Sequence, residues 1–506
     1  MKQGTRWAAL MAAALLTVAL LASCRNTEPP ASNPISQTAS SSAETTDTST
    51  IPTEITAAGE TEGTVSGTAP STTRKPSGSA NTTKGSTAAN TTKQDTPSAK
   101  TLYIKDYGAK GDGVTDDASA IFVAMGALVD AGEGSTLVFE SDKTYYAKSN
   151  GTSLQSILTL DGAKNVTIKG DNTTLLIDAP KYYVDFKNTT GVTLEGFNFD
   201  YKTKPAFRAT LESLNAAAGE AVMIADRDIG MENGEVYTPT VAGNAGWFGV
   251  LDKPEGRYHM YIKQYTMLDK AARKFKITFD TSNGYTKDWL SQLNSVDLVA
   301  PMPYVGHLIE RAFSLTGNTD FTMKNCNVYA MARFGFAVFD SEGTIRFTNV
   351  NLVRASNDLD KNLNFVGWRD GFHCKENRAK IIWDGCKMEG LYDDVFNISA
   401  STMYVKEANG QDEINMHWPE TNGTYSSLKK GDKLTIIDTT TGQLIGTTTV
   451  SRVMKQSGSD NRIKLTDKLP GLKEGENILV FFDSMVAPAR KSRTAIWMVL
   501  SGSAAP

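Results

Sequence analysis

Four short stretches of the chain repeat one pattern of hydrophobic and polar positions. In each, an apolar residue recurs at every second position, Gly or Asn stands fifth, and the alternation then shifts phase: VTLEGFNF from Val192, FTMKNCNV from Phe321, IRFTNVNL from Ile345 and IIWDGCKM from Ile381. Strict alternation predicts a strand with one buried face. Gly or Asn at a fixed place predicts a bend with left-handed backbone. Cys326 and Cys386 occupy the same inward position, so we expect both to be buried.

The interval between these stretches predicts how they stack. VTIKGDN from Val166 begins the same pattern 26 residues before Val192, and Phe321 lies 24 residues before Ile345. Recurrence at this length indicates stacked supersecondary units. Units of short strands and bends, without helices, predict an all-β fold, a right-handed parallel β-helix. Each coil then covers the inward face of its neighbour about 4.8 Å away.

The stretch from Leu102, LYIKDYGAKGDGVTDDASAIFVAMGAL, reads as a strand, a Gly-rich turn and an amphipathic helix that starts at Asp116 and Asp117. This helix is expected to cap the N-terminal end of the solenoid. GDGVTDD could also be read as a calcium loop, but it lacks the full set of oxygen ligands at regular spacing. A turn followed by a helix N-cap is the favoured interpretation.

Interruptions of the pattern divide the folded part of the chain. The coils are expected at 100–202 and 311–399, and two small inserted β-modules at 203–310 and 400–483, where alternating segments with turn signals break the repeat. Insertions in repeat proteins often lie on the binding face. Residues 484–506 lack the repeat pattern, and we interpret them as an atypical end, truncated or frame-shifted, that leaves a strand edge uncovered.

The first hundred residues are predicted to lie outside the fold. Residues 1–24 combine Lys2 and Arg6 with a short apolar run, as in a secretory signal. The run ends in Leu-Ala-Ser-Cys, which resembles the lipobox of bacterial lipoproteins, with Cys24 as the lipidated residue; the alternative is a plain signal peptide cut near Ala22. Residues 25–99, rich in Ser, Thr and Pro, form a disordered linker. This predicts a secreted protein that is lipid-anchored to the bacterial cell membrane, on its extracellular face.

Charge and cysteine content exclude some functions. The chain has 52 Lys and Arg against 56 Asp and Glu, without a basic cluster, which argues against a nucleic-acid partner. Cys326, Cys374 and Cys386 show no metal-ligand spacing. We therefore predict no metal centre and no cofactor.

Two adjacent aspartates in an apolar run, Asp393 and Asp394, are the strongest candidates for chemistry. Asp370 precedes Asp393 by 23 residues, one coil length, so stacking places it beside the pair with carboxyl groups about 5 to 9 Å apart. Three acidic groups this close cannot all ionise easily, so one should have a raised pKa and act as a general acid. A deprotonated partner would activate water.

Residues around this triad are candidates for substrate binding. Trp368, Arg369 and His373 flank Asp370, and an exposed aromatic ring beside carboxylates is a common surface for stacking a sugar. Each has a structural alternative: the aspartates as turn residues, His373 as a hydrogen-bonded structural residue, and Trp368 as packing beneath an insertion.

These residues resemble a known family. DYGAKGDGVTDDASAI resembles the start of the pectate-lyase-like β-helix superfamily, and DGFHCKENRAKIIWDGCKMEGLYDDVFNIS resembles the catalytic segment of family 110 glycoside hydrolases, inverting exo-α-galactosidases. The family's pattern falls on Asp370, His373, Asp393, Asp394 and Asn397. The resemblance implies that Asp393 is the general acid, that Asp370 and Asp394 are the water-activating bases, and that the partner is a glycan with terminal α-1,3-linked galactose.

The chain also departs from that family. After Asn397 it has Ile398-Ser399-Ala400 where the family usually has Val-His-Gly, so a histidine beside the sugar is missing. Two alternatives stay open: another β-helix polysaccharide enzyme, such as a polygalacturonase-like hydrolase or a pectate lyase, and a non-catalytic, glycan-binding surface β-helix.

Overall fold

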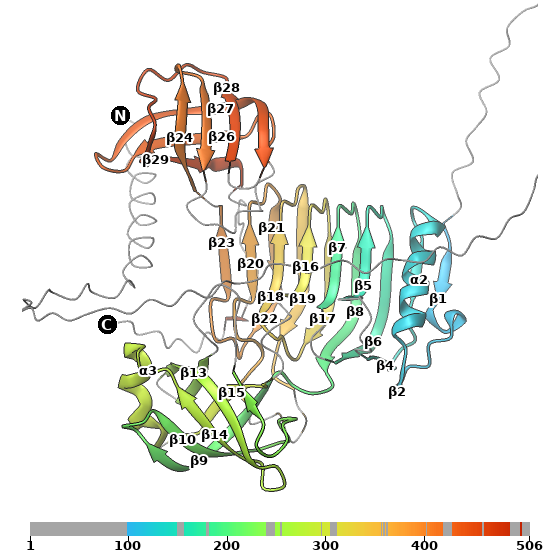
Figure 1. The fold of residues 1–506 in the computed structure, drawn as a ribbon. Coiled ribbons are helices and arrows are strands. Elements are labelled where there is room, and N and C mark those ends of the chain that lie inside the picture. Colours follow the sequence, from blue (N-terminus) through green and yellow to red (C-terminus); the bar gives the residue numbers. More distant parts are fainter. Residues whose placement is uncertain are drawn as a thin grey trace, which may run out of the picture. The chain divides into compact units, whose positions relative to one another are not determined.

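Two parallel sheets form the body of the protein. The computed structural model describes residues 99–148, 156–178, 182–238, 248–253, 256–294, 296–303, 311–355, 357, 360, 363–400, 402–417, 428–457, 460–485 and 496–497. Every strand pair in these two sheets is parallel. Crossovers between parallel strands are right-handed almost without exception. The chain is therefore a right-handed parallel β-helix, as the repeat predicts, and Figure 1 shows its strands stacked between α2 and β23.

The first sheet contains the strands predicted from the repeat. Its order is β1-β3-β6-β8-β17-β19-β22-β30, with β2, β4 and β21 paired alongside. The strands are β1 (Thr101–Tyr103), β2 (Asp112–Asp116), β3 (Thr136–Val138), β4 (Thr144–Ala147), β6 (Thr167–Ile177), β8 (Thr193–Tyr201), β17 (Thr322–Val328), β19 (Thr344–Leu352), β21 (Lys380–Asp384), β22 (Lys387–Met388) and β30 (Ile496–Trp497).

The bend predicted at the fifth position is left-handed in all four stretches. Gly196, Asn325, Asn349 and Gly385 have φ of +81°, +54°, +51° and +62°. The neighbouring side chains form a ladder of amide hydrogen bonds, in which Asn198 donates to Asn172, Asn327 to Asn198 and Asn351 to Asn327. Cys326 and Cys386 are buried, as predicted.

The second sheet carries a column of stacked rings. Its order is β23-β20-β18-β16-β7-β5. The strands are β5 (Ser156–Asp161), β7 (Tyr182–Lys187), β16 (Arg311–Thr316), β18 (Phe334–Phe339), β20 (Phe372–Lys375) and β23 (Phe396–Ser399). Phe313, Phe336, Phe372 and Phe396 stack face to face, one ring per rung, with centroids 4.2, 4.6 and 5.5 Å apart. This column aligns the last two strands, on which the candidate site depends.

Helix α2 (Ala118–Ala131) follows the short 3-10 helix η1 (Ile104–Tyr107) and packs its apolar face into the solenoid core. Asp117 stands at its N-cap position, but the carboxylate accepts hydrogen bonds from the Lys110 and Gly111 amides instead of capping the helix. Asp112 accepts from Thr115 and Val114 in the same way, which lowers its pKa to about 2. GDGVTDD thus contains the irregular strand β2, and its carboxylates accept hydrogen bonds from backbone amides of the same segment. No helix in the described part of the chain is long and apolar enough to span a membrane.

The first insertion is a seven-stranded antiparallel sheet in the order β11-β13-β12-β15-β9-β10-β14, closed by a further β13–β14 pairing. Its elements are β9 (Ala206–Asn215), β10 (Glu220–Ala225), β11 (Val236–Tyr237), β12 (Phe248–Lys253), β13 (Gly256–Asp269), β14 (Lys274–Phe279), α3 (Gly284–Trp289), η2 (Leu290–Asn294) and β15 (Leu298–Pro301). Its apolar interior belongs to the same hydrophobic cluster as the β-helix core.

The second insertion is a closed barrel in the order β24-β25-β28-β27-β26-β29, with its own separate apolar cluster. Its elements are β24 (Met403–Asn409), β25 (Glu413–His417), β26 (Lys433–Asp438), β27 (Gln443–Ser457), β28 (Asp460–Leu465), β29 (Gly475–Phe482) and η4 (Asp483–Met485).

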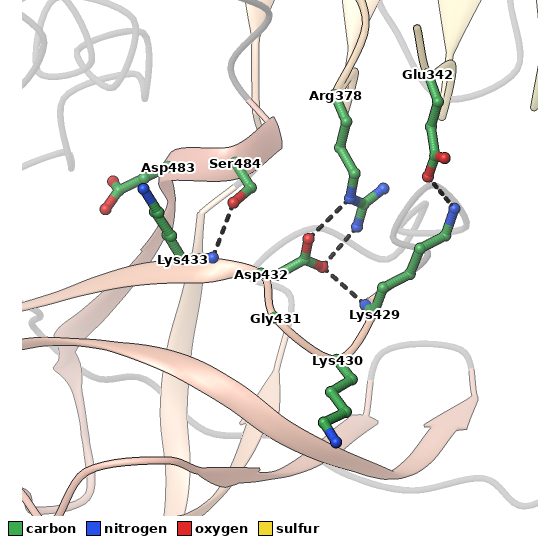
Figure 2. Close-up of a pocket in the computed structure, with 9 residues that line it drawn as sticks. All are labelled: Glu342, Arg378, Lys429, Lys430, Gly431, Asp432, Lys433, Asp483 and Ser484. Atoms are coloured by element: carbon green, nitrogen blue, oxygen red, sulfur yellow. Dashed lines mark hydrogen bonds and ion pairs between the residues drawn. The ribbon is translucent and has the colours of Figure 1, made fainter. Parts of the chain in front are cut away.

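The barrel is tied to the β-helix by ion pairs at an open cleft of about 590 Å³ (Figure 2). Arg378 donates two hydrogen bonds to Asp432, at 2.8 and 2.6 Å, and Lys429 pairs with Glu342.

The segment after the barrel differs from the prediction for residues 484–506. Ile496–Trp497 forms β30, which pairs in parallel with Lys387 and Met388 of β22. Because only two residues pair, their alternation is too short to be recognised in the sequence. The barrel is therefore inserted between two strands of the solenoid.

Candidate active site

The register of β20 and β23 brings the predicted aspartates together. Phe372 pairs with Phe396 and His373 with Asn397. Two residues before each strand stand Asp370 and Asp394, and the Gly371 amide donates to the Asp394 carbonyl at 2.9 Å. Asp370 therefore lies one rung from Asp394, and Asp393 directly precedes Asp394 in the sequence.

The three carboxylates converge. One carboxylate oxygen from each of Asp370, Asp393 and Asp394 lies within 4.8 Å of the other two. Asp370 is only 3% exposed, and Asp393 and Asp394 are exposed. The site is a buried carboxylate with two accessible ones in front of it.

Two of the three carboxylates have basic partners. His373 Nδ1 lies 2.6 Å from Asp370 Oδ2, and Phe334 packs against the His373 ring with centroids 4.7 Å apart. Arg369 Nη1 donates to Asp393 Oδ2 at 3.1 Å. Predicted as substrate contacts, His373 and Arg369 thus both hold carboxylates of the cluster. Phe334 was not predicted, because nothing in its own strand distinguishes it from a core residue.

Asp394 is the member without a basic partner among the described residues. Partial burial raises the pKa of its carboxyl, and the negative charges of Asp393 and Asp370 raise it further, while His373 acts in the opposite direction. Like charges that lie close together disfavour the ionised form of a carboxyl, which is the direction found for Asp394. The cluster can therefore offer a proton donor next to a proton acceptor.

Trp368 does not present its ring to a ligand. Its side chain is 0% exposed and packs between Phe365 and Tyr392, with centroids 4.8 and 5.2 Å away. The prediction of an exposed sugar-stacking ring is wrong for this residue. The cause is the first inserted module, whose Ala206 and Val299 belong to the same apolar cluster.

Asn397 lies beside His373 across the strand pair, half-buried, and accepts a hydrogen bond from the Ser399 hydroxyl at 3.3 Å. Its side chain is on the same face of the sheet as His373. The site therefore contains Asp370, Asp393, Asp394, Arg369, His373 and Asn397, and excludes Trp368. Cys24, the predicted lipidation site, lies outside the described residues.

The carboxylate oxygens are near enough to share a cation, the one such grouping of acidic, His or Cys side chains among the described residues. Arg369 and His373 already interact with two of the three carboxylates, and a cation would have to compete with them. The arrangement favours proton transfer, and we assign no metal to it.

Comparison with known proteins adds likenesses of fold. No protein-family model matches the chain, and no curated protein matches it in sequence. Among solved structures, the chain is similar to a protein from Parabacteroides merdae named as a candidate glycosyl hydrolase, with 12% identity, a TM-score of 0.29, and 58% of this chain and 89% of that chain covered. It is also similar to a family 28 exopolygalacturonase of Yersinia enterocolitica (12% identity, TM-score 0.24, 61% and 46% covered).

A third similar structure is PfbA, a surface adhesin of Streptococcus pneumoniae (11% identity, TM-score 0.24, 60% and 66% covered). The chain spans less than two thirds of the latter two proteins. These likenesses do not assign an activity. The class of the protein, a parallel β-helix with a carboxylate cluster on its last complete rungs, follows from its own strand pairing and side chains.

Proposed function

We propose that the protein is a glycoside hydrolase that removes terminal α-linked galactose from glycans by general acid and base catalysis. The observation that supports this most directly is the triad of Asp370, Asp393 and Asp394, whose oxygens converge within 4.8 Å. Glycosidic bonds are cleaved by two carboxyl groups, of which one donates a proton to the leaving oxygen and the other remains ionised.

The contacts favour a division of labour within the triad. Asp394 is the proton donor, because it forms no ion pair in the described structure and because partial burial and the charges of Asp393 and Asp370 raise its pKa more than His373 lowers it. Asp370, held by His373 and positioned one rung away, is the base that activates water. Asp393 is held by Arg369. This differs from the roles implied by the resemblance, in which Asp393 donates the proton.

The sugar and linkage rest on the resemblance to family 110 glycoside hydrolases, which implies galactose in α-1,3 linkage. Ile398-Ser399-Ala400 replaces the family's usual Val-His-Gly, so the part of the pocket next to Asn397 is built differently here. We also propose, from the lipobox-like Leu-Ala-Ser-Cys alone, that the enzyme is anchored outside the bacterial cell through Cys24.

The stereochemical course is open to a direct test. Inverting glycosidases usually keep their carboxyl groups about 6.5–9.5 Å apart and retaining ones about 5–5.5 Å. The resemblance implies inversion. An inverting enzyme would release β-galactose first, and a first-formed α-galactose would show retention.

The experiment is a screen of α-1,3-, α-1,4- and α-1,6-galactosides, with NMR detection of the released anomer. We expect hydrolysis of the α-1,3 substrate by the wild type, and its loss in Asp370→Asn and Asp394→Asn. The control is Asp130→Asn, which removes an exposed carboxylate on α2 and should keep full activity. Failure to hydrolyse any α-galactoside would refute the galactosidase proposal. Unsaturated products and loss of activity with a chelator would instead identify a lyase.

A further inference from the structure

The first inserted module packs against the backbone that carries the catalytic carboxylates. Six buried residues form one apolar cluster: Ala206 and Val299 from the module strands β9 and β15, and Leu363, Phe365, Trp368 and Tyr392 from the β-helix. Tyr261, on strand β13 of the module, packs against the same cluster. The module and the site thus share a small core of their own.

Two rings of this cluster directly precede the catalytic residues. Trp368 is followed by Arg369 and Asp370, and Tyr392 by Asp393 and Asp394. The rings are in edge contact, with centroids 5.2 Å apart, and the Tyr392 amide donates to the Gly367 carbonyl at 2.9 Å. A displacement of either ring therefore moves a carboxylate that lies one or two residues further along the chain.

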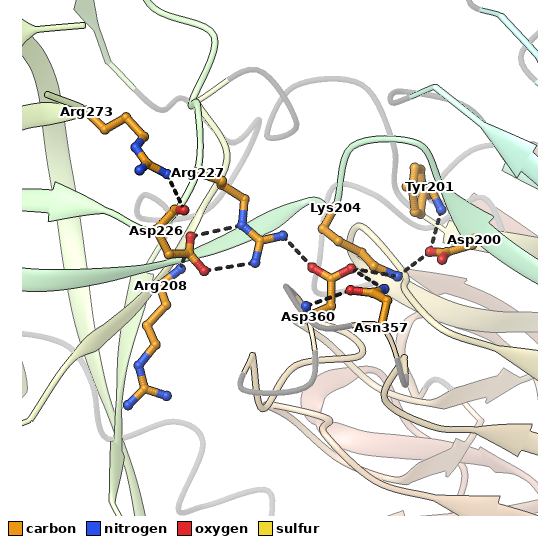
Figure 3. Close-up of polar contacts among 9 residues, drawn as sticks. All are labelled: Asp200, Tyr201, Lys204, Arg208, Asp226, Arg227, Arg273, Asn357 and Asp360. Carbon is orange, nitrogen blue, oxygen red and sulfur yellow. Dashed lines mark hydrogen bonds and ion pairs between the residues drawn. The ribbon is translucent and has the colours of Figure 1, made fainter. Parts of the chain in front are cut away.

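A buried ionic contact ties the module to the same segment (Figure 3). Arg227, whose side chain is 9% exposed, pairs with Asp360 at 2.5 Å, ten residues before Asp370. It also binds Asp226 through two hydrogen bonds of 2.9 Å. Lys204 lies 3.9 Å from the second Asp360 oxygen and also pairs with Asp200.

We propose that the first inserted module is a positioning element of the active site, which holds the triad in place through Asp360, Trp368 and Tyr392. The expected effect on the reaction rate rests on the proposed hydrolase function. Reacting groups must be held to a fraction of an ångström by packing behind them, and a misplacement of about 1 Å can lower a rate about 100-fold. The module supplies that packing behind the triad.

The second module offers a matched control. Its barrel is tied to the β-helix by the Arg378–Asp432 pair, which is also largely buried and is formed by two hydrogen bonds where the Arg227–Asp360 pair has one. No residue adjacent to the triad belongs to the barrel's described apolar cluster. Asp360→Asn and Asp432→Asn therefore each remove a carboxylate that pairs one of the two modules with the β-helix. In both variants the arginine keeps a second carboxylate, Asp226 or Asp340, so neither leaves a bare buried charge.

The first measurement is steady-state kinetics of both full-length variants on the α-galactoside that the wild type cleaves. Asp360→Asn is expected to lower kcat about 10- to 100-fold with little change in KM, and to shift the limbs of the pH–rate profile, because the coupling of the carboxyl groups depends on their separation. Both substitutions are expected to lower the Tm, and the decrease in Asp432→Asn should be at least as large as that in Asp360→Asn. In Asp432→Asn, however, kcat and the pH–rate profile should stay unchanged.

The second measurement needs no substrate. The side-chain carboxyl carbons of the triad are titrated by NMR in both variants. A shift of the Asp394 midpoint in Asp360→Asn, but not in Asp432→Asn, supports the positioning role even if the wild type cleaves no galactoside and the proposed activity fails. An unchanged Asp394 midpoint in Asp360→Asn, or equal effects of the two substitutions, would overturn the inference.

Discussion

The three aspartates of the candidate site are chemically identical but have different neighbours. His373 contacts Asp370 and Arg369 contacts Asp393, whereas partial burial and the charges of Asp393 and Asp370 raise the pKa of Asp394, against a smaller opposing effect of His373. A bound proton relieves repulsion most effectively at Asp394. The raised pKa of Asp394 is what favours it as the proposed proton donor.

This assignment predicts a dependence on the leaving group. Asp394→Asn removes the proposed acid, so kcat on a disaccharide should fall about 10²- to 10⁴-fold. Hydrolysis of a nitrophenyl galactoside should fall much less, because that leaving group needs no proton. Kinetics on the two substrates test this. If Asp393→Asn shows the larger dependence on the leaving group, Asp393 is the acid and the resemblance-based assignment holds.

The raised pKa of Asp394 also predicts a pH effect on stability. The folded chain binds this proton more tightly than the unfolded chain, whose reference pKa is 3.8, so Asp394 favours folding while protonated. That contribution is lost as the pH rises from 3.8 through the folded-state pKa. Asp394→Asn should therefore stabilise the protein at pH 7 and raise its Tm. Because the group is exposed, the gain in the free energy of unfolding should be less than about 1 kcal/mol.

The increase in Tm caused by Asp394→Asn should vanish when the pH falls below 3.8, the pKa of this carboxyl in the unfolded chain. Thermal melts between pH 3 and 7 check this prediction. A variant that is less stable than wild type at pH 7 would contradict it.

The sequence predicts the triad but not the surroundings of Trp368. Asp370 and Asp393 are one coil length apart, and stacked coils convert that offset into proximity whatever the side chains are. The burial of Trp368 depends instead on Ala206 and Val299, which come from a different module far away in sequence. The sequence around Trp368 gives no sign of that contact. From the local sequence alone, a tryptophan beside carboxylates is therefore predicted to be exposed and to stack against a sugar.

At the level of elements, the bend positions are the part of the repeat that tolerates the fewest substitutions. Gly196 has φ of +81°, and a Cβ there would lie 2.1 Å from the Gly170 carbonyl oxygen. Asn occupies the equivalent bends of the next two coils, at Asn325 and Asn349, because it tolerates a left-handed backbone. The periodic Gly or Asn could be predicted from the sequence, since it reflects a constraint within each rung.

Gly196→Ala should therefore destabilise the protein by about 2 kcal/mol or more, through backbone strain and the clash with Gly170. The control is Gly126→Ala, in the middle of α2, where a Cβ meets nothing within 4 Å and where helix propensity predicts a gain of up to about 1 kcal/mol. Chemical denaturation of the two variants measures both changes. Similar stabilities of the two would contradict the strain argument.

For the whole molecule, the apolar clusters show that the two insertions are joined to the β-helix in different ways. The interior of the first module is continuous with the β-helix core, whereas the barrel has a separate cluster and ionic contacts at its base (Figure 2). The first module should therefore unfold together with the solenoid, and the barrel should open independently.

Two truncations test this division. Ile436→Ala, in the barrel core, should lower barrel stability by about 2–5 kcal/mol, with amide exchange in the solenoid unchanged. Ile277→Ala, equally buried in the first module, should increase exchange in both the module and the solenoid. Hydrogen exchange followed by mass spectrometry resolves the two regions. Increased exchange throughout the molecule in Ile436→Ala would show that the barrel is coupled to the rest.

The column of phenylalanine rings has a consequence for how such a site can evolve. Phe372 and Phe396 stack with centroids 5.5 Å apart, and each follows an aspartate of the proposed site, Asp370 or Asp394, by two residues. Rungs of a β-helix are separated by a fixed rise of about 4.8 Å, so carboxylates on successive coils have backbone separations that come in whole steps. Mutation cannot tune this distance gradually. A new catalytic spacing must come from a longer or shorter side chain, or from an acidic residue transferred to another rung.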